Sequence, residues 1–401
     1  MSRAQAAGRH VRSTVASVLA VAWALLLAGP GEIRGQQGPG SDDPTDRLPV
    51  REVVLENGMR FLILPREGAP TASFVLQFGI GGVHERPGQT GIAHLLEHML
   101  FKGTATLGTR DLEAERAYFR RIDAVHDTLL AARRVADTVA VEALRTRIRV
   151  LEDSARIHVD SNAFDRVLSR EGAQGLNATT TSESTIYYME LPANRAELWF
   201  ALEADRMRNP VFREFYSERD VVLEERRMRV DASPGGTLYE RHLAEAFQVH
   251  PYGQPVVGHM RDLERISRGD LEHYHRSYYT PNNAVVAIVG NVDPDDVEHL
   301  AQRYFADIPA GEPPPPVDAE EPRQDGERRI DIAWDAQPLL RIGWHVPSQL
   351  HEDAPALAVL SSLLTGGRSS RLHRRLVTET QVATGVYSSL GPGSRYPGLL
   401  Q

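Results

Sequence analysis

A proline-rich stretch near position 310 places the strongest constraint on how this chain can fold. Residues 309–328 read PAGEPPPPVDAEEPRQDGER, with an unbroken proline run from Pro313 to Pro316. Proline fixes φ and lacks a backbone N–H, so neither a helix interior nor a central strand tolerates such a run. The stretch therefore predicts a linker between a first unit, residues 50–308, and a second unit, residues 329–401.

The length and composition allow a hydrophobic core on each side of this linker. The chain has 401 residues, more than one core usually organises. Hydrophobic residues make up 41% and charged residues 25%, which is ordinary for a soluble globular protein and too apolar for a disordered one. The net charge of -9 argues against a nucleic-acid partner, because a phosphate-binding surface normally needs a basic excess.

The N-terminus has the pattern of a secretory signal peptide. Arg3, Arg9 and Arg12 precede a small and apolar run, residues 15–28, that is too short to cross a bilayer. We therefore expect a cleaved signal peptide, residues 1–35, and no stable membrane span after cleavage. The expected location is the periplasm or the extracellular space.

The segment after the signal peptide, residues 36–49, is rich in Gly, Pro, Asp and Ser and predicts a flexible leader. Exported proteins often rely on disulfides, but this chain contains no cysteine. Stability must therefore come from packing, and any metal must be bound by histidine and carboxylate side chains.

Strand-like segments open the first unit. In REVVLENGMRFLIL, residues 51–64, two apolar runs flank Asn57-Gly58, a dipeptide that favours a two-residue hairpin turn. Further strand-like runs cover residues 72–78, 176–191 and 283–292. They predict an antiparallel sheet within an α+β fold.

Helical spacing predicts the elements that cover this sheet. Residues 90–104 predict a short amphipathic helix with Thr90 as N-cap and Gly103 as C-cap. Residues 111–159 predict a charged helical hairpin that serves as a lid or spacer without chemistry of its own. Further helices are predicted at residues 194–207, 217–230, 238–247, 267–279 and 294–305, the last capped by Asp293.

The second unit is predicted to be incomplete. Residues 329–334 and 338–346 and a helix over 353–364 begin another α+β unit, yet residues 329–401 are fewer than a typical domain contains. A sheet begun in this way would have unpaired edges. We therefore expect a missing continuation or a partner subunit to complete it.

A five-residue string, HLLEH, carries the clearest chemistry. It places His94 and His98 one helical turn apart on the same face, where both imidazoles can reach one metal ion. Glu97 adjoins that face, where a carboxylate can accept a proton from a water molecule without binding the metal. The alternative is a helix whose two histidines are ordinary surface residues.

A catalytic zinc site needs a third protein ligand, and SERDVVLEERRM is the best candidate helix for it. Ser217 is an apt N-cap for this helix, and Glu218 and Glu225 lie two turns apart along one face. Glu225 is the candidate ligand and Glu218 a candidate residue for orienting a histidine. Glu224 remains a rival, because spacing alone does not separate adjacent carboxylates.

The motifs together resemble the pitrilysin (insulinase) family of zinc metallopeptidases, in a bacterial two-domain form similar to processing peptidases. GIAHLLEHMLFKGT looks like the family's inverted zinc motif, HxxEH. LNATTTSESTIYY resembles its substrate-side strand, and ERDVVLEERRM its third-ligand helix. HPYGQPVVG, YYTPNNAVVAIVGNVD and TGGRSSRLHRRL are similar to later landmarks, so the resemblance runs from about Val50 to the C-terminus.

The resemblance implies a set of roles for particular residues. It implies one zinc ion per chain on His94, His98 and Glu225, with Glu97 as general base and Glu218 beside a ligand. It favours Glu225 over Glu224, because the family's ligand lies seven residues after an acidic position that Glu218 matches. Substrate-binding residues are implied at three further positions, Asn177 and Ala178 on an edge strand and Phe101 beside the zinc helix.

The resemblance also implies two similar domains, each an antiparallel sheet covered by helices, and a chamber that needs a second half. The implied function is a zinc-dependent endopeptidase acting on peptides or unfolded polypeptides held as an extended strand, with a second half-peptidase subunit or C-terminal continuation as partner. The alternative is a non-catalytic partner or peptide-binding subunit of a heteromeric peptidase.

Two departures from the family pattern bear on this choice. The connection from His98 to Glu225 is longer than usual, and the predicted hairpin at residues 111–159 accounts for the excess. The arginine and tyrosine that many members place over the substrate carbonyl appear here as Val377 and Thr384, with Tyr387 as a displaced candidate. The sequence therefore leaves the source of these two groups open.

Overall fold

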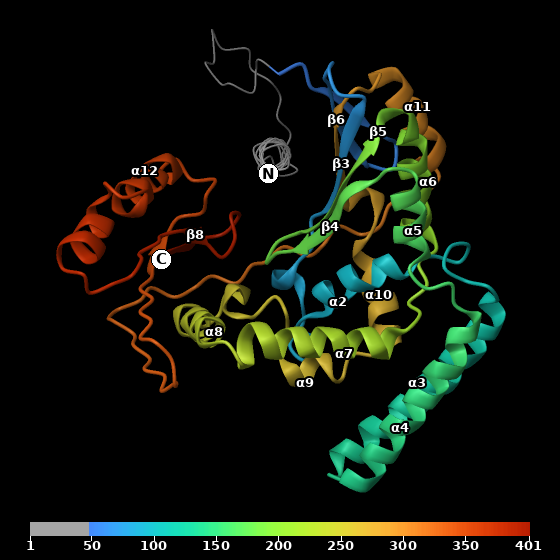
Figure 1. The fold of residues 1–401 in the computed structure, drawn as a ribbon, viewed down its shortest axis with the longest axis horizontal. Helices are drawn as coiled ribbons and strands as arrows, with labels where there is room; N and C mark the ends of the chain where they lie inside the picture. Colours follow the sequence, from blue (N-terminus) through green and yellow to red (C-terminus); the bar gives the residue numbers. More distant parts are fainter. Residues whose placement is uncertain (1–47) are drawn as a thin grey trace, which may run out of the picture.

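The computed structural model describes residues 48–401 (Figure 1). The predicted signal peptide, residues 1–35, and residues 36–47 of the predicted leader lie outside the described residues. Within residues 48–401, no helix combines the length and the apolar character that crossing a membrane requires.

A six-stranded mixed sheet is the centre of the first unit (Figure 1). Its spatial order is β1-β2-β6-β3-β5-β4, and the strands are β1 (Arg51–Val54), β2 (Arg60–Pro65), β3 (Thr71–Phe78), β4 (Gln174–Thr180), β5 (Thr185–Pro192) and β6 (Ala284–Gly290). All neighbours pair antiparallel except β2 and β6, which run parallel. The prediction of an antiparallel sheet is therefore wrong at this pair. A parallel pair needs a long crossover, and the chain between residues 65 and 284 provides it.

The turn between β1 and β2 is longer than the Asn57-Gly58 dipeptide predicts. Val54 pairs with Arg60, and the N–H of Leu55 still donates to the carbonyl of Met59, so the loop covers residues 56–58 rather than two residues. Gly58 has a positive φ of 85°. The Asn57 side chain donates two hydrogen bonds, to the backbone carbonyls of Phe305 and Ile308. Asn57 thus anchors the loop to a distant segment, and the two-residue turn does not form.

Helices pack beside the sheet and close the hydrophobic core (Figure 1). They include α5 (Ala163–Arg170), α6 (Ala196–Arg208), α10 (Arg268–Tyr278) and α11 (Pro294–Phe305). Aromatic rings pack between the sheet and the helices. The ring of Phe74 stacks on Trp199 with 5.1 Å between centroids, and the ring centroids of Phe61 and Phe305 are 5.8 Å apart. Asp293 caps α11, and Pro294 is its first residue, as predicted.

Two helices that matter for the site begin at other residues than predicted. The helix α2 (Ile92–Met99) follows Gly91, because the predicted cap Thr90 donates its hydroxyl to Asp262. The helix α7 (Phe215–Arg226) starts after Glu214 and continues into a π-helical turn, Arg227–Asp231. It is followed by α8 (Pro234–Ala246) and α9 (Met260–Leu263). The predicted cap of α7, Ser217, lies inside its first turn and bonds Glu152.

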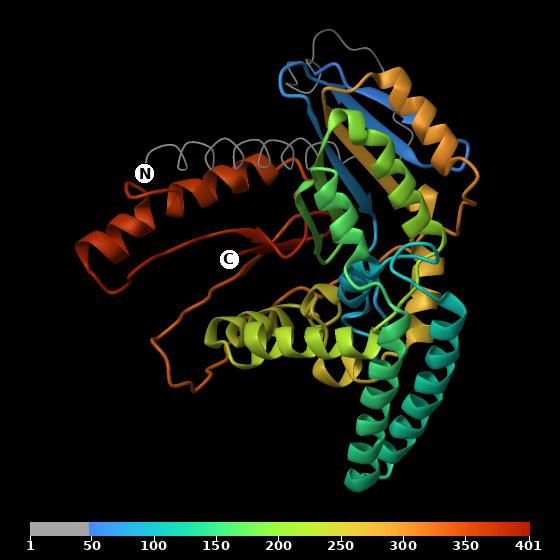
Figure 2. The same ribbon diagram turned by 45° about the vertical axis from the view of Figure 1, so that its right-hand side comes forward.

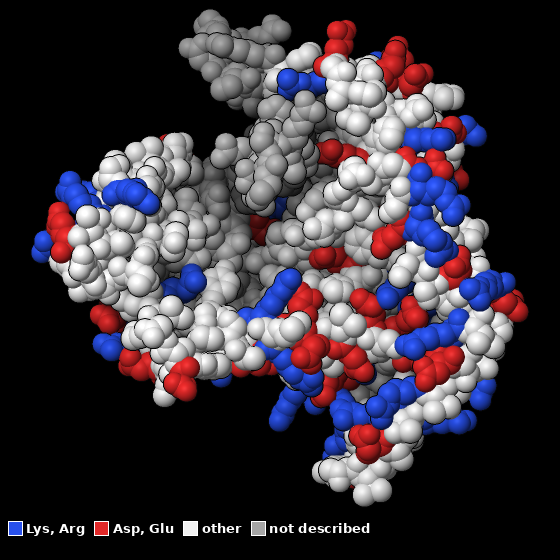
Figure 3. All heavy atoms as spheres, viewed as in Figure 1, with Lys and Arg blue, Asp and Glu red and all other residues white. Residues whose placement is uncertain are grey.

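The predicted helical hairpin is present and extends away from the sheet (Figures 1 and 2). It consists of α3 (Leu112–Arg134) and α4 (Thr138–Ala155), capped by Asp111 and Asp137. Arginine side chains are interspersed with acidic ones over the face of the hairpin seen in Figure 3. This mixture is typical of a solvated helical surface.

The second unit contains less regular structure than predicted. It has the helix α12 (Ala354–Thr365) and a small sheet ordered β7-β9-β8, formed by β7 (Trp344–Val346), β8 (Leu390–Gly391) and β9 (Gly398–Leu400). Residues 329–343, predicted to be largely strands, form neither a strand nor a helix, and Leu339, Leu340 and Ile342 are exposed. A strand needs a neighbour for its backbone groups, and these residues have none within residues 48–401.

Candidate metal centre

The helix α2 brings the two predicted histidine ligands together. It lies against α7 and the edge strand β4, with its apolar residues in the core. His94 and His98 lie one turn apart, and their rings are 4.8 Å apart at an angle of 82°. His94 is buried and His98 half-buried, so the pair faces a partly desolvated space.

Glu225 of α7 joins the histidines. Its carboxylate oxygens lie 3.7 Å from His94 Nε2 and 3.4 Å from His98 Nε2, and one ligand atom from each of the three residues lies within 4.8 Å of the others. The side chain of Glu225 is 14% exposed, whereas that of its rival Glu224 is 56% exposed and pairs with Arg227. The geometry therefore places Glu225, and not Glu224, beside the histidines.

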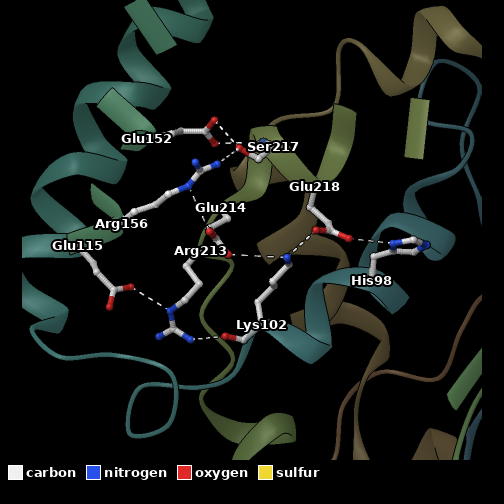
Figure 4. A network of polar contacts seen from close by, with 9 residues as sticks. All are labelled: His98, Lys102, Glu115, Glu152, Arg156, Arg213, Glu214, Ser217 and Glu218. Atoms are coloured by element: carbon white, nitrogen blue, oxygen red, sulfur yellow. Dashed lines mark hydrogen bonds and ion pairs between the residues drawn. The ribbon is translucent and has the colours of Figure 1, made fainter. Parts of the chain in front are cut away.

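Glu218, the residue predicted to orient a histidine, lies behind His98. His98 Nδ1 donates to Glu218 Oε1 at 3.0 Å, so in the neutral ring Nε2 is the nitrogen that can bind a metal (Figure 4). Lys102 Nζ approaches the other Glu218 oxygen at 2.6 Å. Burial raises the pKa of Glu218, but the contacts with His98 and Lys102 outweigh it and the pKa is lowered. Glu218 is thus held ionised and orients the imidazole.

The two histidines differ in electrostatic environment. Burial, and then the charges of His98 and Arg229, lower the pKa of His94 to about 3. Burial also lowers the pKa of His98, but the hydrogen bond and charge of Glu218, together with Glu225 and Glu97, outweigh it and the pKa is raised. His94 is consequently the neutral imidazole that a metal requires.

Glu97 lies beside the ligand group without belonging to it. Thr180, the last residue of β4, donates its hydroxyl to Glu97 Oε2. Burial is the main reason that the pKa of Glu97 is raised, and the Thr180 hydrogen bond opposes it. A raised pKa makes a carboxylate a better proton acceptor than an ordinary glutamate.

The predicted substrate-binding residues have different settings. Asn177 and Ala178 lie on β4, which is an edge of the six-stranded sheet as predicted. Ala178 N–H donates to the Asn177 side chain at 2.9 Å, so a peptide that pairs there must displace that amide. Phe101 packs against the core at ring distances of 6.2 Å from Phe164 and 6.1 Å from Tyr187, and its role in substrate binding stays a prediction.

The residues present fit a zinc ion. Two imidazoles and one carboxylate form the donor set typical of catalytic zinc, whereas magnesium and calcium prefer oxygen donors alone. His94 Nδ1 is buried and has no hydrogen-bond partner among residues 48–401, which leaves the orientation of that ring to its other nitrogen and its packing. Arg229 contacts Glu225 Oε1 at 2.6 Å, but its side chain is largely exposed and free to move toward solvent.

Three residues in the neighbourhood were not singled out from the sequence. Lys102 could have been predicted from helical spacing, because it follows His98 by four residues and so lies on the same face. Thr180 could be found only from the register of β4. Glu85 accepts hydrogen bonds from the N–H groups of Gly91 and Ala93 at the start of α2, and burial raises the pKa of this carboxyl to about 8.

The candidate groups of the second unit lie on irregular structure. Val377 is in a π-helical stretch, His373–Glu379, and Thr384 follows it without regular structure. Tyr387 is exposed. The absence of an arginine and a tyrosine at the two expected positions therefore remains a departure from the family pattern.

Two family profiles match the chain. The profile described as "Insulinase (Peptidase family M16)" matches residues 60–118 and 156–259. The profile described as "Peptidase M16 inactive domain" matches residues 265–400. The first match passes over most of the α3–α4 hairpin, which agrees with its interpretation as an insertion.

Related proteins and solved structures agree with these matches. "Zinc protease PqqE" of Helicobacter pylori is 30% identical over 350 residues, which are 85% of this chain and 67% of that protein. "Uncharacterized zinc protease YmxG" of Bacillus subtilis is 26% identical over 344 residues, covering 84% and 69%. The crystal structure of a protease from Helicobacter pylori matches with a TM-score of 0.70 at 27% identity, covering 88% of this chain and 74% of that one.

A more distant likeness concerns the fold alone. The first half of the periplasmic protease PqqL from Escherichia coli matches with a TM-score of 0.57 at 17% identity, and the alignment covers 88% of this chain and 67% of that one. In another structure of PqqL, which is not restricted to the first half, the alignment covers 88% of this chain and 34% of the PqqL chain.

Proposed function

Because the chain belongs to the bacterial zinc proteases of the insulinase (pitrilysin) family, peptidase family M16, we propose that it is a zinc-dependent endopeptidase. Its substrates are peptides or unfolded polypeptides held as an extended strand. The observation that carries this proposal is the convergence of His94, His98 and Glu225 beside Glu97 at the edge strand β4. A protein that only stored metal would need neither the base nor the edge strand.

The residues of the chain divide the work as follows. His94, His98 and Glu225 would hold the zinc ion, and Glu218 fixes the ring of His98 through Nδ1. Bound there, zinc supplies a positive charge that polarises the scissile carbonyl and lowers the pKa of water. Glu97 accepts the proton of the attacking water and returns it to the leaving amine, while Thr180 holds its Oε2 atom.

The substrate is proposed to lie along β4. A free sheet edge offers unpaired backbone groups to an extended peptide, which is β-augmentation. Asn177 and Ala178 are at that edge, and Thr180 of the same strand contacts Glu97. A peptide paired with β4 would therefore extend directly toward the proposed base.

We further propose that the first unit, residues 50–308, is the catalytic domain and that the second unit, residues 329–401, belongs to a similar domain completed by further chain or by a subunit. The likeness to one half of the longer PqqL structure supports pairing with a second half. Such a pairing would form a chamber around unfolded chains. The exported location predicted from the N-terminus suits a protease of this kind.

One observation favours a second candidate, a non-catalytic partner or peptide-binding subunit. Val377 and Thr384 stand where the expected oxyanion-stabilising side chains would be, and loss of one such donor typically costs about 100-fold or more in rate. The complete zinc-binding group and Glu97 favour the catalytic function instead.

Turnover of a quenched fluorescent peptide library distinguishes the two candidates. We expect slow cleavage by the 401-residue chain, faster cleavage after a second half-peptidase is added, and loss of both in Glu97→Gln. The control Glu224→Gln, on an exposed carboxylate, should cleave as wild type does. No cleavage with or without the second half would favour the binding subunit, and full activity of the isolated chain would refute the need for a partner.

A further inference from the structure

The helix that carries Glu225 lacks a cap of its own. The residue before α7, Glu214, has a φ of 56°, and its side chain caps none of the free N–H groups. The N–H of Ser217 in the first turn donates instead to Glu152 Oε1 at 3.1 Å, and its hydroxyl donates to Glu152 Oε2 at 2.8 Å. Glu152 belongs to α4 and is 7% exposed. A buried carboxylate of the hairpin therefore takes the part that an N-cap side chain plays in other helices.

The hairpin contacts the same end of α7 through three more polar pairs. In each pair, one residue lies in or just before the first turns of α7 and the other lies in α3. The pairs are Arg213 Nε–Glu115 Oε2 (3.0 Å), Tyr216 OH–Asp123 Oδ1 (2.9 Å) and Arg219 Nη1–His126 Nε2 (2.9 Å). Glu115, His126 and Arg219 are buried. These contacts fix both the axial position and the rotation of α7 at its N-terminal end.

The neighbouring residues of α7 point to the metal helix. Glu218 follows Ser217 directly and contacts His98 and Lys102, and Glu214 lies between Lys102 and Arg156 at 3.7 and 3.5 Å (Figure 4). Glu225 lies two turns further along the same helix. Because an α-helix is rigid over this length, about 12 Å from Ser217 at 1.5 Å per residue, a shift at Ser217 is passed on to Glu218 and Glu225.

We propose that the α3–α4 hairpin positions the metal-binding helix α7, with Glu152 as the positioning residue, and thereby sets the affinity of the zinc site. The proposal rests on the proposed zinc function. Asp123, His126 and Glu152 all lie in the segment that the family profile passes over, so the proposal concerns this chain and not the family as a whole. On this proposal the hairpin is more than a spacer.

The test compares three variants of the full chain in their binding of zinc and cobalt. Glu152→Ala removes both acceptors of Ser217 and should weaken zinc binding about 10-fold or more, the range measured for residues that support metal ligands. It should also change the visible absorption spectrum of the cobalt(II)-substituted protein, which reports the geometry of the ligands. Glu152→Gln keeps one acceptor and should retain most of the affinity. Glu142→Ala, on the same helix and 65% exposed, should match wild type in both measurements.

The outcomes separate positioning from stability. A folded Glu152→Ala protein with wild-type zinc affinity and cobalt spectrum, even at a lower melting temperature, would overturn the inference while leaving the proposed function intact. Wild-type protein that binds no zinc would overturn both. If Glu152→Ala does not fold, Ser217→Ala keeps the N–H bond to Glu152 and removes the hydroxyl, which donates to Glu152 and accepts from Arg156 at 3.4 Å. It should show the same change in smaller measure, and an unchanged spectrum there would refute the inference.

Discussion

Replacing Glu225 by glutamine should remove most of the zinc affinity. The substitution keeps the shape of the side chain but removes the negative charge that lies 3.7 and 3.4 Å from the two imidazole Nε2 atoms. Residues that merely support a ligand contribute 10- to 100-fold in affinity. A direct ligand should contribute at least about 100-fold, which is about 2.7 kcal/mol of binding free energy.

Two matched variants make the expectation specific to position 225. Glu224 is exposed and pairs with Arg227 at 2.8 Å, and an exposed pair of this kind contributes less than about 1 kcal/mol to stability and nothing to the site. Glu224→Gln should therefore bind zinc as wild type does. Glu97→Gln should also keep zinc, because its carboxylate bonds Thr180 and is outside the ligand group.

The assay is competition for zinc against a chromophoric chelator, with metal content checked by elemental analysis. Wild type should hold about one zinc ion per chain, since the three ligands form a single group. Equal loss of affinity in Glu97→Gln and Glu225→Gln would refute the division into base and ligand. Loss in Glu224→Gln alone would move the ligand by one residue.

Two further predictions concern stability. Arg213 and Glu115 form a buried ion pair whose side chains are 1% and 0% exposed, so Arg213→Ala leaves the Glu115 carboxylate buried without its partner. The substitution should lower the free energy of unfolding, measured by denaturant titration, by about 3 to 5 kcal/mol. The control Arg116→Ala, at an exposed arginine, should change it little, and equal effects would contradict the argument. Burial lowers the pKa of His275 from 6.5 to about 4, so between these pH values the unfolded chain binds a proton that the native state does not. The free energy of unfolding should therefore decrease as the pH falls from about 6.5 to 4. His275→Gln should flatten that part of the profile, and an unchanged slope would show that other groups cause it.

Local spacing was sufficient to predict the elements that depend on near neighbours. The facing imidazoles of His94 and His98 need only an i, i+4 pair on a helix. The cap at Asp293 and the start of α11 at Pro294 follow from the preferences of two adjacent residues. The structure has both features, because each depends only on residues within one or two turns of the same helix.

Contacts between distant residues explain the predictions that are wrong. Ser217 has the chemistry of an N-cap, but Glu152 accepts both of its hydrogen bonds, and α7 begins earlier. Thr90 likewise bonds Asp262 instead of capping α2. The parallel pairing of β2 with β6 belongs to the same class, since an apolar strand has the same pattern whichever way its neighbour runs.

The rotation of α7 decides which glutamate reaches the histidines, and the sequence of α7 does not specify it. Glu224 and Glu225 differ by about 100° around the helix, so a helix rotated by that angle would present Glu224 in place of Glu225. The contacts that fix the rotation come from the hairpin and from α2, which are far away in the sequence. Adjacent carboxylates were therefore inseparable by spacing, and tertiary contacts separate them.

The meeting of Thr180 with Glu97 depends on a break in the regular alternation of β4. Gln174 pairs with Glu190 and Asn177 with Tyr188, so β4 has one more residue than β5 between these pairs. Gly175, at a positive φ of 63°, lies within this bulge, where a left-handed backbone costs glycine little. One extra residue turns every later side chain to the opposite face, so simple alternation counted from Gln174 would turn Thr180 away from Glu97. The glycine of a bulge thus determines which residue of the edge strand holds the proposed base.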